Sequence, residues 1–490
     1  MNTVQGLSHV GSHPGTAGGS SPVTAVASMA AMEHVGDPLA DDVVSRLVGE
    51  RPLPSSTLTI DGPNATARLN EGTRLMAGWT HNGTLLNWPA VRPVPGPGSE
   101  DTVTEVLHDY LQSAAHLPHW ADGAKVARAE NLFMSHGAMS CTLLFCASLP
   151  ECYVLPQLAG VLHIAGQLEA HTEHRIRQTA AMVFPVMMRG GLMSPGGTGV
   201  AQVLKVRLIH ATIRHLILRG NPAQVRGLVP RRQLGEPAGM HQAMSDNGWD
   251  VDAQGVPCNQ IELAYTLLTF SYVFLNGMRK LGQRLSHEDE EAYLHAWNVV
   301  GHVLGIRSEW MAHTMEEAAA LFDRIQARAR TVVVSPDARP PLGRALMNTM
   351  AQAIHVPVLR HVPVPLTQWL IGRKTARDIG VDEKVPLLTR LLFRVGLVLV
   401  RVVDAVVGLV SSRFSIVRLF MRTIGYHMLT RFLLDQTRPL TLPDQVLNPM
   451  MDTVAEWSDD PHGSAWINRI EDRLTTTGAW RPRHAGQQKT

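Results

Sequence analysis

The feature that most constrains this fold is the helical spacing of apolar residues, which dominates the chain from Glu100 onward. The alternation with a period of two that marks a half-buried strand is nearly absent there. In one stretch, KVRLIHATIRHLILR with its flanks, residues recur at intervals of three and four along one helical face: Val203, Val206, His210, Ile213 and Ile217. A chain of 490 residues can bury a large core. The sequence therefore predicts an all-α fold.

His210 is the polar member of this apolar face, and Arg207 and Arg214 lie one turn before it and one turn after it. A neutral imidazole in an apolar pocket is a suitable iron ligand, and guanidinium groups bind the carboxylates at the edge of a haem bidentately. The alternative is a core histidine bonded to a carbonyl group, flanked by two solvated arginines. His215 lies more than a quarter turn off this face, so we do not expect it to be a second ligand. The segment alone leaves both interpretations of His210 open.

The composition is that of a protein that buries large apolar faces. Hydrophobic residues make up 45% of the chain and charged residues only 18%, and there are 21 methionines. Such a chain must bury these faces or present some of them to lipid or to an apolar ligand. The net charge is +2 and there is no basic run, so we expect no nucleic-acid partner.

The cysteine pattern excludes two kinds of site. Cys141, Cys146, Cys152 and Cys258 form no CxxC pair, which argues against a structural zinc site, and there is no CxxCH motif for covalent haem attachment. Three of the four lie in an apolar, helix-like run. We expect them to be buried, reduced thiols.

Composition and turn clusters divide the chain into five stretches. We expect residues 1–40, rich in Gly, Ser, Ala and His, to be disordered, and residues 41–100 to form an irregular N-terminal extension. Residues 101–335 are predicted to form the helical core. Residues 336–443 are predicted to form amphipathic helices that pack on the core or on a membrane, and residues 444–490 a polar tail.

Within the core, residues 162–188 are predicted to form one helix bent at Pro185. The glycine-rich break RGGLMSPGGTGV then allows the His210 helix to fold back antiparallel against it. Arg175 and Thr179 share one face of the first helix, with Gln178 at its flank. This arrangement can place Arg175 and Thr179 on one side and His210 on the other side of a bound group.

Two further apolar helices are predicted over residues 261–281 and 288–304. In the second, Trp297, Gly301 and Gly305 follow one another at intervals of four residues. This spacing suits either a flat group lying against the backbone or tight packing between helices.

The segment 387–434 is very apolar, but it is interrupted by charges. Its longest uncharged runs, 395–400 and 405–412, are far shorter than the roughly 20 residues needed to span a bilayer. We expect amphipathic helices that either pack on the core or lie on a membrane or lipid-like substrate.

Several motifs follow one another in a definite order. They are SLPECY (148–153), RIRQT (175–179), the glycine-rich break, KVRLIHATIRHL (205–216), CNQ (258–260), LLTF (267–270) and WNVVGHVLG (297–305). In this order they resemble the latex-clearing-protein and MpaB-type oxygenase family. The resemblance runs from Leu111 to Arg330 and more weakly to Pro443.

The resemblance implies a b-type haem protein with a globin-related, all-helical core and additional helices. Such proteins use dioxygen to cleave a carbon–carbon double bond in a polyisoprenoid chain. The family's proximal iron ligand is the histidine of an Arg-x-x-His element, which reads Arg207-Leu-Ile-His210 here. It thus implies non-covalent haem b with His210 on the iron. Arg207 and Arg214 are then the expected cofactor-binding cations.

On the other haem face the resemblance implies an Arg-x-x-Lys-Thr element, which here reads Arg175-Ile-Arg-Gln178-Thr179. We expect Arg175, Gln178 and Thr179 to be the catalytic residues that donate hydrogen bonds toward dioxygen. Gln178 replaces the lysine and cannot supply an amine ligand, which argues against rubber itself as the substrate. The family's distal glutamate has no clear counterpart, and Glu151 and Glu169 are the nearest acids.

We therefore expect a haem oxygenase whose partners are dioxygen and a hydrophobic, unsaturated small molecule of isoprenoid or lipid type. The alternative is a non-catalytic haem- or lipid-binding helical protein. A di-iron enzyme would need paired Glu-x-x-His elements, and only Glu105-Val-Leu-His108 is present. Because no signal peptide or twin-arginine element is seen, we expect a cytoplasmic protein with at most peripheral membrane contact.

Overall fold

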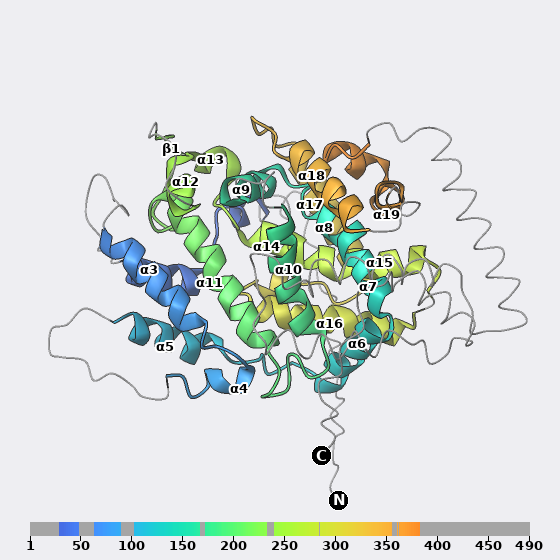
Figure 1. Ribbon diagram of the computed structural model, residues 1–490, viewed down its shortest axis with the longest axis horizontal. Coiled ribbons are helices and arrows are strands. Elements are labelled where there is room, and N and C mark those ends of the chain that lie inside the picture. The colour runs from blue at the N-terminus through green and yellow to red at the C-terminus, as the bar shows by residue number, and fades with distance from the viewer. Residues whose placement is uncertain are drawn as a thin grey trace, which may run out of the picture.

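The computed structural model describes residues 29–48, 63–89, 102–166, 172–232, 240–283, 285–354, 360 and 362–382. Figure 1 shows that these residues form a bundle of helices, which confirms the predicted helical class. The two strands of the described part, β1 (Leu228–Val229) and β2 (Trp249–Asp250), form a short antiparallel pair.

The helices up to the glycine-rich break and the one after it are α2 (Pro38–Val48), α3 (Pro63–Met76), α4 (Asn82–Leu85), α5 (Val103–Ala114), α6 (Gly123–Ser135), α7 (Gly137–Leu143), a π-helical turn (Leu144–Ser148), α8 (Leu149–Glu151), α9 (Pro156–Gly166), α10 (Thr172–Met187) and α11 (Gly199–Leu218). The later helices are α12 (Met240–Asp246), α13 (Val251–Gln254), α14 (Gln260–Phe270), α15 (Tyr272–Lys280), α16 (His287–Val303), a 3-10 turn (Ser308–Trp310), α17 (Met315–Ala329), α18 (Arg339–Ala353) and α19 (Pro363–Asp378).

The α10 and α11 helices lie side by side in the middle of the molecule (Figure 1). The chain turns back between them, and the backbone N–H of Gly199 donates to the carbonyl of Gly191 at 2.9 Å. The fold-back of the His210 helix is therefore confirmed. The described parts of the single helix predicted over residues 162–188 are helical, in α9 up to Gly166 and in α10 from Thr172, and residues 167–171 lie outside the described residues.

Asn82, at the start of α4, holds this turn together. Its side-chain amide donates to the carbonyls of Gly191 and Ser194, both at 2.9 Å. Its carbonyl oxygen accepts from the backbone N–H groups of Val200 and Ala201 at 3.0 and 3.3 Å. Because those N–H groups belong to the first turn of α11, Asn82 caps that helix from a distant part of the chain.

The N-terminal stretch differs from the prediction. Residues 29–40, expected to be disordered, include a helical turn and the start of α2, and α2 packs against α11. Residues 41–100, expected to be irregular, include α3 and α4. The predicted disorder of residues 1–28 lies outside the described residues. Asp37 followed by Pro38, the first residue of α2, is an ordinary helix start, but the small residues around this pair conceal it in an average over composition.

The helix predicted over residues 261–281 is broken at Ser271 into α14 and α15, whereas α16 matches the prediction for 288–304. The Trp297 ring is buried and stacks on Phe270, with ring centroids 5.5 Å apart. A Cβ atom on Gly301 would lie only 2.9 Å from a methyl group of Leu267. Of the two interpretations of this motif, tight packing between helices is therefore the one that fits.

The described residues include only the first part of the predicted C-terminal stretch. The first helices of the stretch 336–443 are α18 and α19, while the segment 387–434 and the tail 444–490 lie outside the described residues. Among the described helices, no single one is long and apolar enough to cross a bilayer. Only α6 taken together with Met139–Glu151 meets that test, with a 91° bend between them.

All four cysteines are buried and none forms a disulfide, as expected.

Candidate functional site

His210 lies in the middle of α11 with an imidazole that has no hydrogen-bond partner at Nδ1, although that atom is buried. Burial, and after it the positive charge of Arg214, lowers the pKa of His210 to about 4. The ring is therefore neutral at pH 7. A core histidine would satisfy its buried nitrogen with a carbonyl group, and His210 does not. It has the electronic state of a metal ligand and no competing bond at Nδ1.

The face of α11 that carries His210 is only partly covered. Val206, His210 and Ile213 are all half-buried. The adjoining side of the helix, at Arg207, Ala211 and Arg214, is buried against its neighbours. The apolar stripe predicted from the sequence is thus the more accessible side of the helix at His210.

The expected distal residues come from α10, which packs along α11. Thr179 is half-buried and Gln178 is exposed. Arg175 belongs to the same helix, but its side chain lies outside the described part of the structure. The structure thus brings the helix of the RIRQT motif to the helix of His210, while the catalytic roles of these residues remain predictions.

Arg177, in the same motif, is fully buried, and the sequence analysis gave it no role. Its spacing of two residues from Arg175 and Thr179 does not place it on their face, which is why helical periodicity overlooked it.

Arg207 binds an aspartate. Its Nε and second terminal nitrogen donate to the two carboxylate oxygens of Asp37 at 2.5 and 2.8 Å, and its remaining nitrogen donates to the carbonyl of Val303 at 3.1 Å. Although burial opposes the charge, the hydrogen bond and the charge of Asp37 raise the pKa of Arg207. The guanidinium expected to steady a haem propionate is therefore occupied by Asp37.

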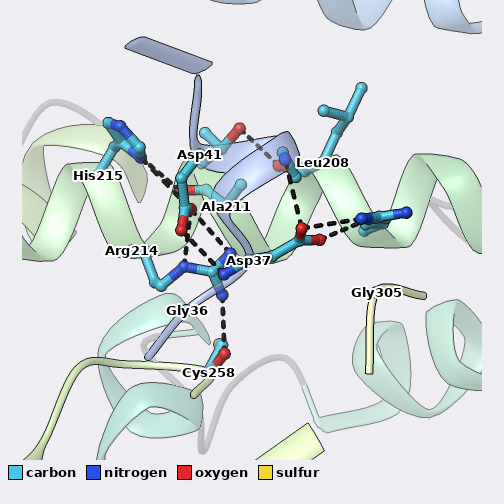
Figure 2. Close-up of polar contacts among 12 residues, drawn as sticks. Gly36, Asp37, Asp41, Leu208, Ala211, Arg214, His215, Cys258 and Gly305 are labelled. Atoms are coloured by element: carbon cyan, nitrogen blue, oxygen red, sulfur yellow. Dashed lines mark hydrogen bonds and ion pairs between the residues drawn. The ribbon is translucent and has the colours of Figure 1, made fainter. Parts of the chain in front are cut away.

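Arg214 is bound in the same manner, as Figure 2 shows. Its Nε donates to Asp41 at 2.9 Å, a terminal nitrogen lies 2.8 Å from the same oxygen, and the other donates to the carbonyl of Cys258 at 2.7 Å. Burial raises the pKa of Asp41, against the lowering influence of Arg214. The alternative interpretation assumed two solvated arginines, but both are buried. Neither can bind an external carboxylate while its ion pair with the aspartate is formed.

The two aspartates also bind backbone N–H groups at the start of α2. Asp37 directly precedes the helix and accepts from the backbone N–H of Ala40 at 3.4 Å, while Asp41 accepts from the backbone N–H of Asp37 at 2.9 Å. Neither aspartate could be recognised from local spacing, because each lies far from its arginine in the sequence, by 170 and 173 residues. The signal present in the sequence was two carboxylates four residues apart, one on each side of Pro38.

His215 is a structural histidine. Its Nδ1 lies 3.0 Å from the carbonyl of Ala211 and its Nε2 lies 3.0 Å from the hydroxyl of Ser45. Since a carbonyl can only accept, Nδ1 carries the proton and Nε2 accepts from Ser45. Burial lowers the pKa of His215 to about 4. With both nitrogens bonded, His215 is not a competitor of His210.

Of the two acids nearest to the distal element, Glu169 lies outside the described residues and Glu151 is buried. The carboxylate of Glu151 accepts from the hydroxyl of Tyr265 at 3.1 Å and from the amide of Gln326 at 2.9 Å. Burial raises the pKa of Glu151 to about 8. These three side chains, from α8, α14 and α17, form a hydrogen-bonded network.

The di-iron alternative gains no support from the described residues. Glu105 closes the capping box of α5 with Thr102, and Nδ1 of His108 lies 2.8 Å from the carbonyl of Trp88. Within the described ranges, no group of three or more His, Cys, Asp or Glu side chains is placed to hold a metal ion.

The fold is similar to that of a solved structure described as "Structure of Latex Clearing Protein LCP in the closed state". The similarity has a TM-score of 0.57 at 20% identity and covers 84% of this chain and 92% of that one. At this identity the likeness shows a shared fold. The molecule is thus a helical protein of the latex-clearing-protein architecture.

Sequence comparison places the chain in a family. Residues 144–402 match the family described as "ER-bound oxygenase mpaB/B'/Rubber oxygenase, catalytic domain", and the chain belongs to this family. It is 24% identical to the rubber oxygenase of Streptomyces sp. (strain K30) over 392 residues, which is 76% of this chain and 79% of that protein. The resemblance stated from the motifs is confirmed, and the chain is a member of an oxygenase family.

Proposed function

We propose that the protein is a haem b-dependent oxygenase that uses dioxygen to cleave a carbon–carbon double bond in an apolar, isoprenoid- or lipid-like substrate. Membership of the oxygenase family supports the reaction class. The haem assignment is supported by the imidazole of His210. This ring is neutral at pH 7 and half-buried, and its buried Nδ1 lacks a hydrogen-bond partner.

The residues fit a haem in one respect and not in another. His210 fits as the axial ligand, since a neutral ring nitrogen is what iron requires. Arg207 and Arg214 do not fit as propionate ligands, because Asp37 and Asp41 occupy them. The propionates would have to be met by other groups.

Bound haem would supply the iron centre at which dioxygen reacts with the alkene. The chain supplies the surroundings. His210 would hold the iron through the ring nitrogen that carries no proton, and Val206 and Ile213 provide apolar surface next to it. On α10, the hydroxyl of Thr179 and the amide of Gln178 are neutral donors that do not bind iron as an amine would.

The absorption spectrum of the purified protein tests the proposal. We expect a Soret band that shifts with dithionite and with CO, and we expect His210→Ala to lose it. The matched control is His215→Ala, which removes a histidine five residues away whose nitrogens are already bonded. A colourless, iron-free wild-type protein would refute the haem assignment. Loss of haem only in His215→Ala would show that His210 is not the iron ligand.

Oxygen uptake then separates an oxygenase from a haem- or lipid-binding protein without turnover. We expect uptake that depends on added unsaturated terpenoid or fatty substrates and yields carbonyl products. Haem binding with no alkene-dependent uptake would favour the non-catalytic alternative.

A further inference from the structure

We propose that α2 is the positioning element of the ligand histidine. Two ion pairs, Asp37–Arg207 and Asp41–Arg214, together form what we call the double clasp, and they fix the rotation of α11 about its axis and with it the direction of His210. The inference rests on the proposed function only in treating His210 as an iron ligand.

The spacing of the double clasp suits this role. At 100° per residue, Arg207 and Arg214 project about 60° and 40° from His210, both toward the same side of α11. They are seven residues apart, which is about 10 Å along the axis. A helix held at one point can roll and tilt, whereas two anchors on one side, one turn before and one turn after His210, restrict both motions.

Each anchor makes more than one contact. Arg207 binds Asp37 with a two-pronged contact and also donates to the carbonyl of Val303, at the end of α16. Arg214 binds Asp41 and also donates to the carbonyl of Cys258, before α14. Each guanidinium thus joins α11 to α2 and to a third segment. A flexible surface pair would not hold a direction in this way.

Two glycines lie directly against the carboxylate groups of the double clasp. A Cβ atom on Gly305, whose φ is +88°, would lie 2.4 Å from a carboxylate oxygen of Asp37. A Cβ atom on Gly36 would lie 2.6 Å from a carboxylate oxygen of Asp41. Figure 2 shows both glycines beside the carboxylate groups that they cover. Both glycines therefore allow a close approach of the carboxylate groups that a larger residue at either position would prevent.

The test uses Asp37→Asn and Asp41→Asn in the full chain, which remove one charge each and keep the side-chain shape. The control is Glu33→Gln, which breaks a comparable pair, Glu33–Arg328, between the same N-terminal segment and α17. Arg207→Lys serves as a second variant, since it keeps the charge but loses the two-pronged contact. Circular dichroism selects the variants that fold.

In haem-loaded protein we expect Asp37→Asn and Asp41→Asn to release haem to apomyoglobin about 10- to 100-fold faster than wild type, the usual effect of removing a group that orients a metal ligand. We also expect altered electron paramagnetic resonance g-values of the ferric iron. Glu33→Gln should leave both unchanged. Wild-type release rates and g-values in both aspartate variants would overturn the inference, as would an equal change in Glu33→Gln.

A haem-free measurement separates this inference from the proposed function. Hydrogen exchange of α11 amides in haem-free protein should quicken in Asp37→Asn and Asp41→Asn, and remain as in wild type in Glu33→Gln. Wild-type protein that takes up no haem would refute the proposed function alone. Unchanged α11 exchange in both aspartate variants would refute the double clasp, whether or not haem binds.

Discussion

Replacing Arg214 by alanine should destabilise the protein by about 3–5 kcal/mol at pH 8, the usual cost of leaving one member of a buried ion pair without its partner. Arg214 is fully buried and supplies donors to Asp41 and to the carbonyl of Cys258. The carbonyl left without its donor adds a penalty of about 1 kcal/mol. We expect the sum to stay within the range above, because Asp41 can escape part of it by taking up a proton.

That escape makes the loss dependent on pH. Burial already raises the pKa of Asp41 above its ordinary value of 3.8, and Arg214 opposes the rise, so the variant must raise it further. A group whose pKa is higher in the folded state binds more protons there, so the free energy of unfolding falls as pH rises between the two pKa values. The destabilisation by Arg214→Ala should therefore be larger at pH 8 than at pH 5.

Urea unfolding of haem-free wild type, Arg214→Ala, Asp41→Asn and the double variant at both pH values measures this. The double variant should unfold at a higher urea concentration than Arg214→Ala, because it no longer buries a lone carboxylate. Single-variant losses that add to the double-variant loss within about 0.5 kcal/mol would show that the two side chains are not coupled, and the reasoning would fail.

Four other variants test three separate parts of the structure. Asn82→Ala should lower the free energy of unfolding by about 1–2 kcal/mol, as expected for a lost helix cap, and thermal melting would detect it; an unchanged melting temperature would argue against the cap. Gly305→Ala should cost more than about 1 kcal/mol, because its backbone is left-handed and its new methyl group meets Asp37, and urea unfolding measures it. Thr179→Ala and Arg175→Ala should keep a wild-type Soret band and lose about 10²–10³-fold in alkene-dependent oxygen uptake; full turnover in both would place the reacting face elsewhere.

The sequence was sufficient for features that depend on local periodicity. The apolar stripe around His210 predicted α11, and the glycine-rich break predicted the return of the chain along α10. The break within the helix expected over residues 261–281 was not predictable in the same way. Ser271 is helix-tolerant by propensity, and the apolar spacing continues across it, so nothing local marks the boundary between α14 and α15.

The candidate site shows where local reasoning ends. Arg207 and Arg214 were interpreted as cofactor ligands because their spacing around His210 suits carboxylates, and they do bind carboxylates. Those carboxylates belong to the protein itself, on Asp37 and Asp41. Periodicity identifies the face on which a guanidinium lies, but it carries no information about a partner more than 160 residues away.

The separation of those partners has a consequence for biosynthesis. A ribosome must add another 170 residues after Asp37 before Arg207 exists to bind it. At about 5–20 residues per second, this takes about 10–30 s. Throughout that interval the start of α2 carries two carboxylates without the cations that neutralise them in the native protein. The α2 helix therefore leaves the ribosome long before the arginines of α11 that bind its aspartates, and the double clasp can close only after both segments have been synthesised.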